Sequence, residues 1–391
     1  IDKFFSTLTD EGITGEDYKH AQKVWDMFGC KTLGDYHDLY LKTDVMLLAD
    51  VFENFRSMCM KVYKLDPANY YTAPGLSWDA LLKKTGVKLE QITDYDMYLM
   101  VEKGKRGGIS MVSQRYAKAN NPEVDGYNPH SPEIYIQYLD ANNLYGWAMN
   151  QYLPYGGFEW FIDFEYDFAN HPADSDKGFF LEVDLKYPKE LHDAHNSYPL
   201  APETQQVKKE WLSEYQTNII GNSSLNVEKL VPNLQDKKKY VLHYRNLQLY
   251  LQLGMKVEKI HRVLQFDQSS WMEPYIAMNT ELRKCATSDF AKDLFKLMNN
   301  SVFGKTMENL RKRVDIQLIK SDVSDRKIRK MIAKPSFARC KIFDEDLVAM
   351  QMHKSSLKLN KPMYVGVAIL DLSKHLMYDF YYNELKVKYG D

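Results

Sequence analysis

Residues 291–305 combine cations that could hold a polyanion with an aromatic ring that could stack on a flat ligand. Lys292, Lys296 and Asn300 recur every four residues, so on a helix they would share one face. The opposite face repeats with the same spacing and is apolar: Leu294, Met298 and Val302. The spacing predicts an amphipathic helix that packs on one side and presents ammonium groups on the other. A solvated lysine face would show the same pattern.

The same run ends with small residues at positions where a helix usually has large side chains. Ser301 and Gly304 flank Phe303, and glycine and serine let another chain or a base pair approach closely. This ending favours a binding helix over a merely solvated one.

A carboxylate is predicted at the end of a strand. Residues 134–140 alternate and are rich in β-branched and aromatic side chains, which predicts a strand ending at Asp140, followed by a turn into a helix. Asp140, with the backbone carbonyl of Ala141 beside it, could bind Mg²⁺ and leave room for phosphate oxygens. An aspartate that caps the next helix is the alternative.

These two stretches together resemble family B DNA polymerases. Lys-x-x-x-Asn-Ser-x-Phe-Gly, from Lys296 to Gly304, resembles motif B, with phenylalanine where tyrosine is commoner. Asp-x-x-Asn-Leu-Tyr, from Asp140 to Tyr145, resembles motif A (Asp-x-x-Ser-Leu-Tyr-Pro), with Asn143 and Gly146 as departures.

The resemblance assigns roles to the matching residues. It implies that Asp140 and the Ala141 carbonyl bind metal, and that residues of both motifs contact the incoming nucleotide and the DNA. The implied nucleotide-binding residues are Leu144, Tyr145, Lys292, Lys296, Asn300 and Phe303, with Ser301 and Gly304 on the DNA. Tyr145 would lie under the sugar and exclude a ribose hydroxyl, while the lysines would hold the triphosphate.

Two weaker patterns agree with this family. Tyr40 and Asp44 lie four apart in a predicted helix over 38–62, so they share a face and resemble the third exonuclease motif, although a surface pair fits equally well. The first two exonuclease motifs would precede this chain, so we expect no proofreading by it. Adjacent glycines flanked by cations, which would contact template phosphates, resemble the family's Tyr-x-Gly-Gly motif or form a plain surface turn: Lys105, Arg106, Gly107 and Gly108.

Two basic stretches predict surfaces for nucleic acid. Residues 229–262 mix cations with four rings, and residues 305–334 are again rich in lysine and arginine. The rings are Tyr240, His243, Tyr244 and Tyr250. A solvated charged face is the alternative for the first stretch. The resemblance makes these regions the two insertions of the protein-primed branch, the second one credited with strand displacement.

Composition bounds the class of protein. The 391 residues are 45% hydrophobic, which is enough to form the cores of two or three lobes. With 51 Lys+Arg against 53 Asp+Glu the net charge is −2, so the composition alone does not indicate a nucleic-acid ligand. Four dispersed cysteines indicate neither a zinc site nor a disulfide framework, which fits an intracellular, reducing compartment. No apolar run is long enough for a bilayer, so no membrane partner is expected.

The sequence therefore predicts an α/β (α+β) fold, a family B polymerase core with the end of a 3′–5′ exonuclease domain, palm, fingers and two insertions. The predicted parts are 1–102 (exonuclease-like), 103–133 (linker with the Gly-Gly motif), 134–154 (palm with motif A), 155–250 (first insertion), 251–304 (palm and fingers with motif B), 305–360 (second insertion) and 361–391 (palm).

By resemblance, the function is template-directed transfer of nucleotides from dNTPs to a primer with two Mg²⁺ ions, in protein-primed replication of a viral or transposable element. Its partners would be primer-template DNA, dNTPs and a terminal priming protein. The missing initiator methionine suggests a fragment, and Tyr389-Gly390-Asp391 resembles a helix end more than the hairpin of motif C. We therefore expect this piece alone to be inactive. The alternative is a catalytically dead DNA-binding remnant.

Overall fold

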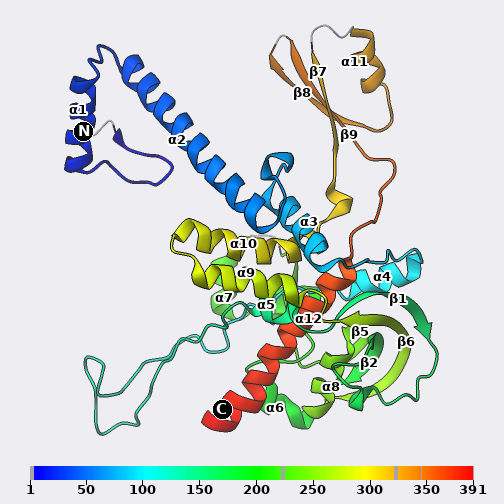
Figure 1. Cartoon of the computed structure of the whole chain (residues 1–391). Helices are drawn as coiled ribbons and strands as arrows, with labels where there is room; N and C mark the ends of the chain where they lie inside the picture. The colour runs from blue at the N-terminus through cyan, green and yellow to red at the C-terminus, as the bar shows by residue number, and fades with distance from the viewer. Residues whose placement is uncertain (1–3, 222–224, 321–324, 345, 391) are drawn as a thin grey trace. The chain divides into compact units, whose positions relative to one another are not determined.

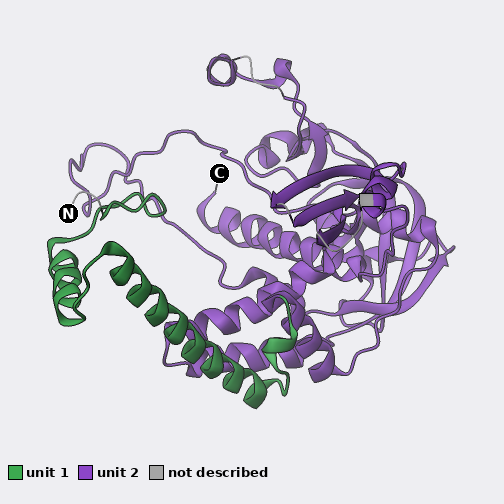
Figure 2. Cartoon of the chain, turned by 90° about the horizontal axis from the view of Figure 1, so that it is seen from above, with its two compact units in different colours: residues 1–71 green, residues 72–391 purple. Residues whose placement is uncertain are grey.

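A computed structural model describes the chain except for residues 1–3, 222–224, 321–324, 345 and 391. The chain divides into two compact units, residues 1–71 and 72–391, shown in different colours in Figure 2. Residues 72–102, predicted to belong to an exonuclease-like part, belong to the second unit, because their helices pack against later helices of that unit.

Unit 1 consists of α1 (Gly15–Met27), α2 (Leu33–Val62) and the 3-10 helix η2 (Pro67–Asn69). The Thr32 hydroxyl accepts from the Asp35 N–H while the Asp35 carboxylate accepts from the Thr32 N–H, so a complete capping box starts α2. The helix predicted over 38–62 is thus confirmed and begins earlier. Its apolar stripe is not buried within unit 1, since Val45 is 58% and Leu48 69% exposed.

The main sheet of unit 2 has the order β1-β6-β2-β5, and every neighbouring pair is antiparallel. Its strands are β1 (Leu153–Phe161), β2 (Lys177–Lys186), β5 (Lys237–His243) and β6 (Lys256–Ser269). Because β1 and β2 pair with β6, much of the predicted first insertion shares one sheet with residues 256–269.

Two helices close over this sheet. The core beneath them contains Leu181, Val183, Tyr244, Leu247 and Tyr378, drawn from β2, α8 (Tyr244–Gln252) and α12 (Met363–Asp379). Figure 1 shows α12 crossing the centre of this unit. Residues 361–391, predicted to belong to the palm, are helical from Met363. Helix α12 continues as the π-helix η7 (Phe380–Leu385) and α13 (Lys386–Tyr389); Asp391 lies outside the described residues.

Helices of the second layer pack on one another beside α12. They are α3 (Ala73–Thr85), α4 (Tyr95–Lys103), α5 (Leu144–Met149), α9 (Glu273–Cys285) and α10 (Asp289–Thr306). Gly366 of α12 lets the end of α10 approach, because a Cβ there would overlap Met307 and Thr306. The Ser77 and Tyr275 hydroxyls both donate to the Met298 carbonyl, so α3 and α9 are tied to α10.

Short elements complete the body of unit 2. They are η3 (Phe168–Asn170), η4 (Lys189–Leu191), α6 (His192–His195), β3 (Glu203–Gln206), η5 (Lys209–Trp211), α7 (Glu214–Ile220), β4 (Glu228–Val231) and η6 (Leu310–Lys312). Strands β3 and β4 form a two-stranded sheet of their own.

Residues 315–352 form an arm with its own small core, inside the range predicted as the second insertion. The arm has a sheet of order β7-β9-β8, made of β7 (Asp315–Lys320), β8 (Phe337–Asp344) and β9 (Leu347–Met352). Helix α11 (Asp325–Ile332) packs on one face of it through Met331 and Ile328.

The strand predicted over 134–140 is wrong. Ile134 makes an isolated bridge to Asn120, and the residues from Tyr135 to Asp140 pair with no strand of the described chain. Tyr138 is 89% exposed, so the alternating side chains are buried on neither face. The pattern was that of a strand, but the described residues supply no partner for it.

None of the helices in the described ranges is long and apolar enough to cross a bilayer.

Candidate functional site

A pocket of about 530 Å³ lies where α5, α9 and α10 meet. It is lined by Asn142, Asn143, Gly146, Trp147, Asn150, Thr280, Arg283, Lys284, Lys292, Lys296 and Asn299. The predicted amphipathic helix is confirmed as α10, with Leu294, Met298 and Val302 buried and Lys292, Lys296 and Asn300 exposed. Packing of the apolar face therefore aims the first two lysines at this pocket.

Four cations line this pocket, and none of its described lining residues is acidic. Lys292 pairs with Asp289 at 3.2 Å and Lys284 with Glu281 at 3.5 Å, both outside the lining. Such a pocket suits a polyanion, because opposite charge near a partly closed surface attracts it.

Arg283 and Lys284 of α9 are pocket cations that sequence reasoning missed. Both lie in the last turn of α9, the helix that directly precedes α10. The detectable signal was a pair of adjacent cations at a helix end just before the lysine helix. Their antiparallel packing partner could only be assigned from the fold.

Asn299, and not Asn300, faces the pocket. The Asn279 amide of α9 donates to Asn299 Oδ1 at 2.9 Å, and both side chains are buried. Asn300 is exposed and is not among the lining residues. Asn299 therefore joins α9 to α10 at the pocket wall.

Tyr145 and Phe303 lie in contact, although 158 positions separate them in the sequence. Their rings stack with centroids 4.6 Å apart and an angle of 26° between planes. Both rings are half-buried, as is Leu144, the first residue of α5. Two residues assigned to the nucleotide from separate motifs thus form one aromatic platform at the α5–α10 contact.

Ser301 and Gly304 are placed differently from each other. The Ser301 hydroxyl donates to the Leu297 carbonyl at 2.6 Å and is mostly buried, so it serves the helix itself. Gly304 is exposed, and a Cβ built on it would meet open space. Of the two, Gly304 leaves room for an approaching molecule.

Asp140 lies in the exposed, extended stretch directly before α5, with Ala141 exposed beside it. No group of three or more His, Cys, Asp or Glu side chains in the described part of the chain could hold a metal ion. A lone carboxylate and a carbonyl do not complete a Mg²⁺ site, since this ion needs six oxygen ligands in near-octahedral geometry.

Comparisons with known proteins decide the family. The family model described as "DNA polymerase type B, organellar and viral" matches residues 35–386. The chain belongs to the type B DNA polymerases. A search of the curated proteins found no match.

Solved structures of phi29 DNA polymerase are similar to this polymerase at low identity. The complex with primer-template DNA has a TM-score of 0.44 and 14% identity, and the ternary complex with nucleotides has 0.42 and 15%. The complex with single-stranded DNA has a TM-score of 0.40 and 16% identity. Each alignment covers 80% of this chain and 46% of the phi29 chain, so this polymerase chain spans less than half the length of those proteins.

The template contact predicted for Arg106 is wrong. Its guanidinium is buried, donates to the Val241 carbonyl at 2.6 Å and lies 3.7 Å from the Tyr240 ring centroid. Arg106 thus fastens the linker to β5, and the Lys374 ammonium donates to the Arg106 carbonyl at 2.9 Å. Lys105 is exposed, and exposed Gly107 and Gly108 leave open space around their Cα atoms.

The stacking groove predicted over 229–262 is also wrong. Its rings, Tyr240, His243, Tyr244 and Tyr250, are all buried in the polymerase core. Several of its cations are engaged by carboxylates of the same sheet: Lys238 pairs with Glu258 at 2.7 Å, and Arg262 Nε donates to Glu182 at 2.8 Å. The aromatic periodicity was that of core strands and a core helix.

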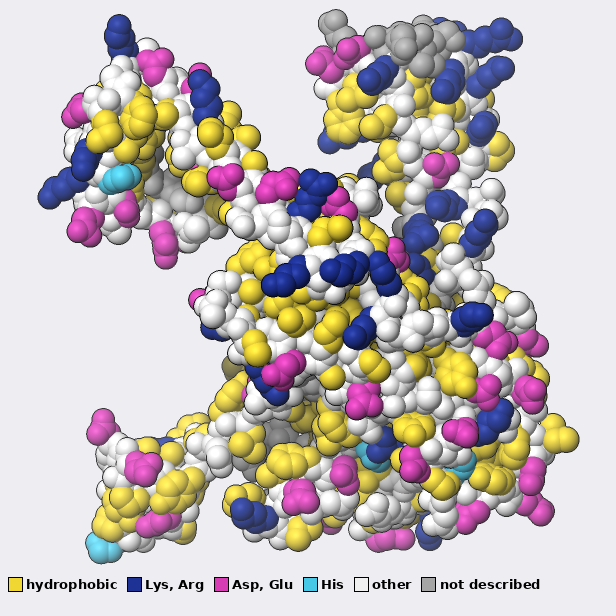
Figure 3. All heavy atoms as spheres, in the orientation of Figure 1, with side chains coloured by type: hydrophobic (Ala, Val, Ile, Leu, Met, Phe, Trp, Pro, Cys, Tyr) yellow, Lys and Arg dark blue, Asp and Glu magenta, His cyan; other side chains and the backbone are white. Residues whose placement is uncertain are grey.

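The second basic stretch remains on the surface. Cations of α11 point away from the arm's core, and Figure 3 shows lysine and arginine side chains gathered over this arm. The exposed cations of α11 are Arg326, Lys327, Arg329 and Lys330. They form a surface suited to a phosphate backbone.

Tyr40 and Asp44 lie on α2 in unit 1. Tyr40 is 60% exposed, and the nearby Asp44 carboxylate raises the pKa of its phenol. The two side chains therefore interact as the spacing of four predicts.

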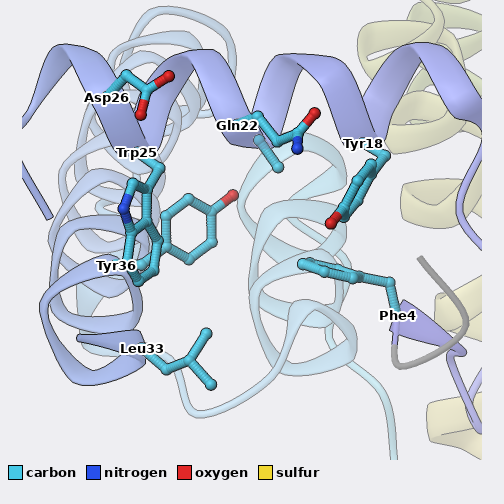
Figure 4. A pocket seen from close by; sticks show the side chains of 8 residues that line it. Phe4, Tyr18, Gln22, Trp25, Asp26, Leu33 and Tyr36 are labelled. Atoms are coloured by element: carbon cyan, nitrogen blue, oxygen red, sulfur yellow. The ribbon is translucent and has the colours of Figure 1, made fainter. Parts of the chain in front are cut away.

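An aromatic pocket in unit 1 was not predicted. It has a volume of about 340 Å³, and in Figure 4 Trp25 and Tyr36 lie at one end and Tyr18 and Phe4 at the other. Trp25 stacks on Tyr36 with centroids 6.1 Å apart. The rings are scattered over three segments of the sequence, so no single motif marks them.

Proposed function

We propose that this chain carries the fingers and part of the palm of a DNA-directed DNA polymerase, and that the α5–α9–α10 pocket holds the incoming dNTP. The observation that carries the proposal is the convergence of Lys292, Lys296 and Arg283 on one pocket. Tyr145 and Phe303, whose rings stack, lie on α5 and α10, two of the helices that line this pocket. The family match supports the enzyme class.

The pocket's chemistry fits nucleotidyl transfer. In that reaction charge grows on the leaving pyrophosphate, and positioned cations stabilise it more in the transition state than in the ground state. Lys296 and Lys292 would hold the triphosphate, with Arg283 and Lys284 reaching it from α9. Tyr145, on the stack with Phe303, would lie under the sugar and exclude a 2′-hydroxyl.

Asp140 is our proposed carboxylate ligand for Mg²⁺, with the Ala141 carbonyl beside it. When bound, Mg²⁺ in this class of reaction lowers the pKa of the attacking hydroxyl and neutralises phosphate charge. The exposed position of Asp140 next to α5 supports a place near the nucleotide pocket.

The proposed partners are primer-template DNA and a terminal priming protein, in protein-primed replication of a viral or transposable element. The "organellar and viral" description of the family supports that setting. Phi29 DNA polymerase has been solved in complexes with primer-template DNA and with incoming nucleotide substrates. The proposed setting is an intracellular, reducing compartment, which the four dispersed cysteines of the sequence fit.

A non-catalytic DNA-binding remnant is the second candidate. The exposed cations of α11 favour it, because they suit a phosphate backbone. The two candidates differ in one property: a remnant needs the basic arm but no nucleotide pocket.

The test is Lys296→Ala in a primer-extension assay with a parent protein that carries the complete motif set. We expect the KM for dNTP to rise about tenfold, because one charge contact to the triphosphate is lost. DNA affinity should stay within about twofold, the error of such a comparison.

Lys42→Ala is the matched control, because Lys42 is an exposed lysine of α2 and does not line the pocket. If Lys296→Ala weakened DNA binding and left the KM for dNTP unchanged, Lys296 would belong to a DNA-facing surface and the pocket assignment would fall.

A further inference from the structure

The start of α5 has an unusual backbone. Asn143, which precedes the helix, has φ 55° and ψ 51°, a left-handed conformation that asparagine tolerates better than most residues. Its side chain makes no capping hydrogen bond to the helix. The usual reason for an asparagine at a helix start is therefore absent at this position.

The Asn143 side chain instead covers Gly146. A Cβ built on Gly146 would overlap the Asn143 amide group, and Gly146 is buried. The space that any other side chain at position 146 would need is thus already filled by Asn143. These are also the two positions at which the chain departs from motif A.

Both residues line the nucleotide pocket, and Tyr145 lies between them in sequence. A side chain at position 146 would force the Asn143 amide to move, and Asn143 is itself one of the residues that line the pocket. A displaced amide that turns into the pocket would take up part of its free volume.

We propose that Asn143 and Gly146 are a matched pair that sets the free width of the pocket at its sugar and base end. The pair is specificity-determining: Gly146 lets Asn143 fold back on α5, and the folded-back amide leaves room for a deoxynucleotide. This inference rests on the proposed function of the pocket. It predicts that neither position can be changed to a larger residue independently of the other.

The experiment measures the affinity of a fluorescent mant-dATP for the 391-residue chain in four forms: wild type, Gly146→Ala, Asn143→Gly and the double variant. Glycine at 143 keeps the left-handed backbone while removing the amide. We expect Gly146→Ala to weaken mant-dATP binding about tenfold. The double variant should bind mant-dATP with an affinity within about threefold of that of Asn143→Gly.

Inorganic tripolyphosphate is the second ligand. Its affinity should be the same in all four forms, because the lysines of α10 are untouched; a general loss of folding would lower both affinities. Circular dichroism of each variant checks that the chain is folded.

The outcomes separate the two proposals. A wild-type chain that binds neither ligand overturns the nucleotide pocket and this inference together. A wild-type chain that binds mant-dATP while Gly146→Ala binds it equally well overturns the matched pair alone. A double variant as weak as Gly146→Ala also overturns it, because the two positions would then not be coupled.

Discussion

Residue types alone did not decide between a binding role and a structural role. Lys105 and Arg106 are adjacent cations in one glycine-rich stretch, yet Lys105 is exposed while Arg106 is buried against Tyr240. The difference arises from side-chain direction at neighbouring positions, which a sequence with no regular period leaves open.

Arg106→Ala should destabilise unit 2. Loss of the hydrogen bond from a charged donor and of the contact with Tyr240 should lower the free energy of unfolding by about 2–3 kcal/mol. Urea denaturation of the chain measures it. Lys105→Ala is the matched control and should change stability by less than about 0.5 kcal/mol. Equal effects of the two variants would contradict the buried role of Arg106.

At the scale of elements, helices with a strong apolar period were predictable and the isolated strand was not. Residues 291–305 became α10 because Leu294, Met298 and Val302 specify a single buried face. Residues 134–140 had the period of a strand, but a strand exists only when another strand accepts its hydrogen bonds, and that information lies elsewhere in the chain.

Part of the candidate site was predictable from the sequence, and part required the packing of helices. Two motifs supplied Tyr145, Lys292, Lys296 and Phe303, whereas Arg283 became visible only when α9 was packed against α10. The tyrosines of residues 240–250 were misread because exposed stacking rings and buried core rings look alike in sequence.

The exposed cations of α11 lead to a prediction about the salt dependence of DNA binding. If its exposed cations contact DNA, replacing Arg326, Lys327, Arg329 and Lys330 with alanine should reduce the log-log salt slope of DNA binding by up to about 3, at roughly 0.7–0.9 per phosphate. Ile328 and Met331, which pack on the arm's sheet, are left in place.

The matched control replaces four cations of β5 and β6, namely Lys238, Lys239, Lys256 and Lys259. Because carboxylates of the same sheet engage part of that surface, its slope should stay close to that of the wild type. A salt slope that falls with the control and not with the α11 variant would move the DNA surface to the main sheet.

At the scale of the whole molecule, buried histidines link stability to pH. Burial, with Lys386 and His192 nearby, lowers the pKa of His195 to about 4, and its Nδ1 is 2.9 Å from the Tyr187 hydroxyl. Burial, with Arg245 nearby, also lowers the pKa of His375 to about 4. Both are neutral in the folded chain at neutral pH.

These lowered pKa values fix the sign of the pH dependence. Between the ordinary pKa of 6.5 and about 4 the unfolded chain binds the protons and the folded chain does not, so stability is full above 6.5 and falls as the pH drops. Each histidine should contribute about 1.4 kcal/mol per pH unit in that window.

Between pH 6.5 and 4.5 the free energy of unfolding should fall less steeply in His195→Gln than in the wild type, by about 1.4 kcal/mol per pH unit. Urea denaturation at a series of pH values measures this slope. His130→Gln, at an exposed site, is the control and should leave the slope unchanged. A slope that does not respond to His195→Gln would mean that His195 is accessible to protons in the folded chain.

Photo-crosslinking tests most directly whether a deoxynucleotide binds in the α5–α9–α10 pocket. Irradiation of the chain with 8-azido-dATP, followed by peptide mapping, should label peptides of α5 or α10, which hold Tyr145 and Phe303. The label should be displaced by unlabelled dATP and reduced by Lys296→Ala. Saturable labelling in the Trp25–Tyr36 pocket of unit 1, or no saturable labelling at all, would contradict the assignment of the α5–α9–α10 pocket to the incoming nucleotide.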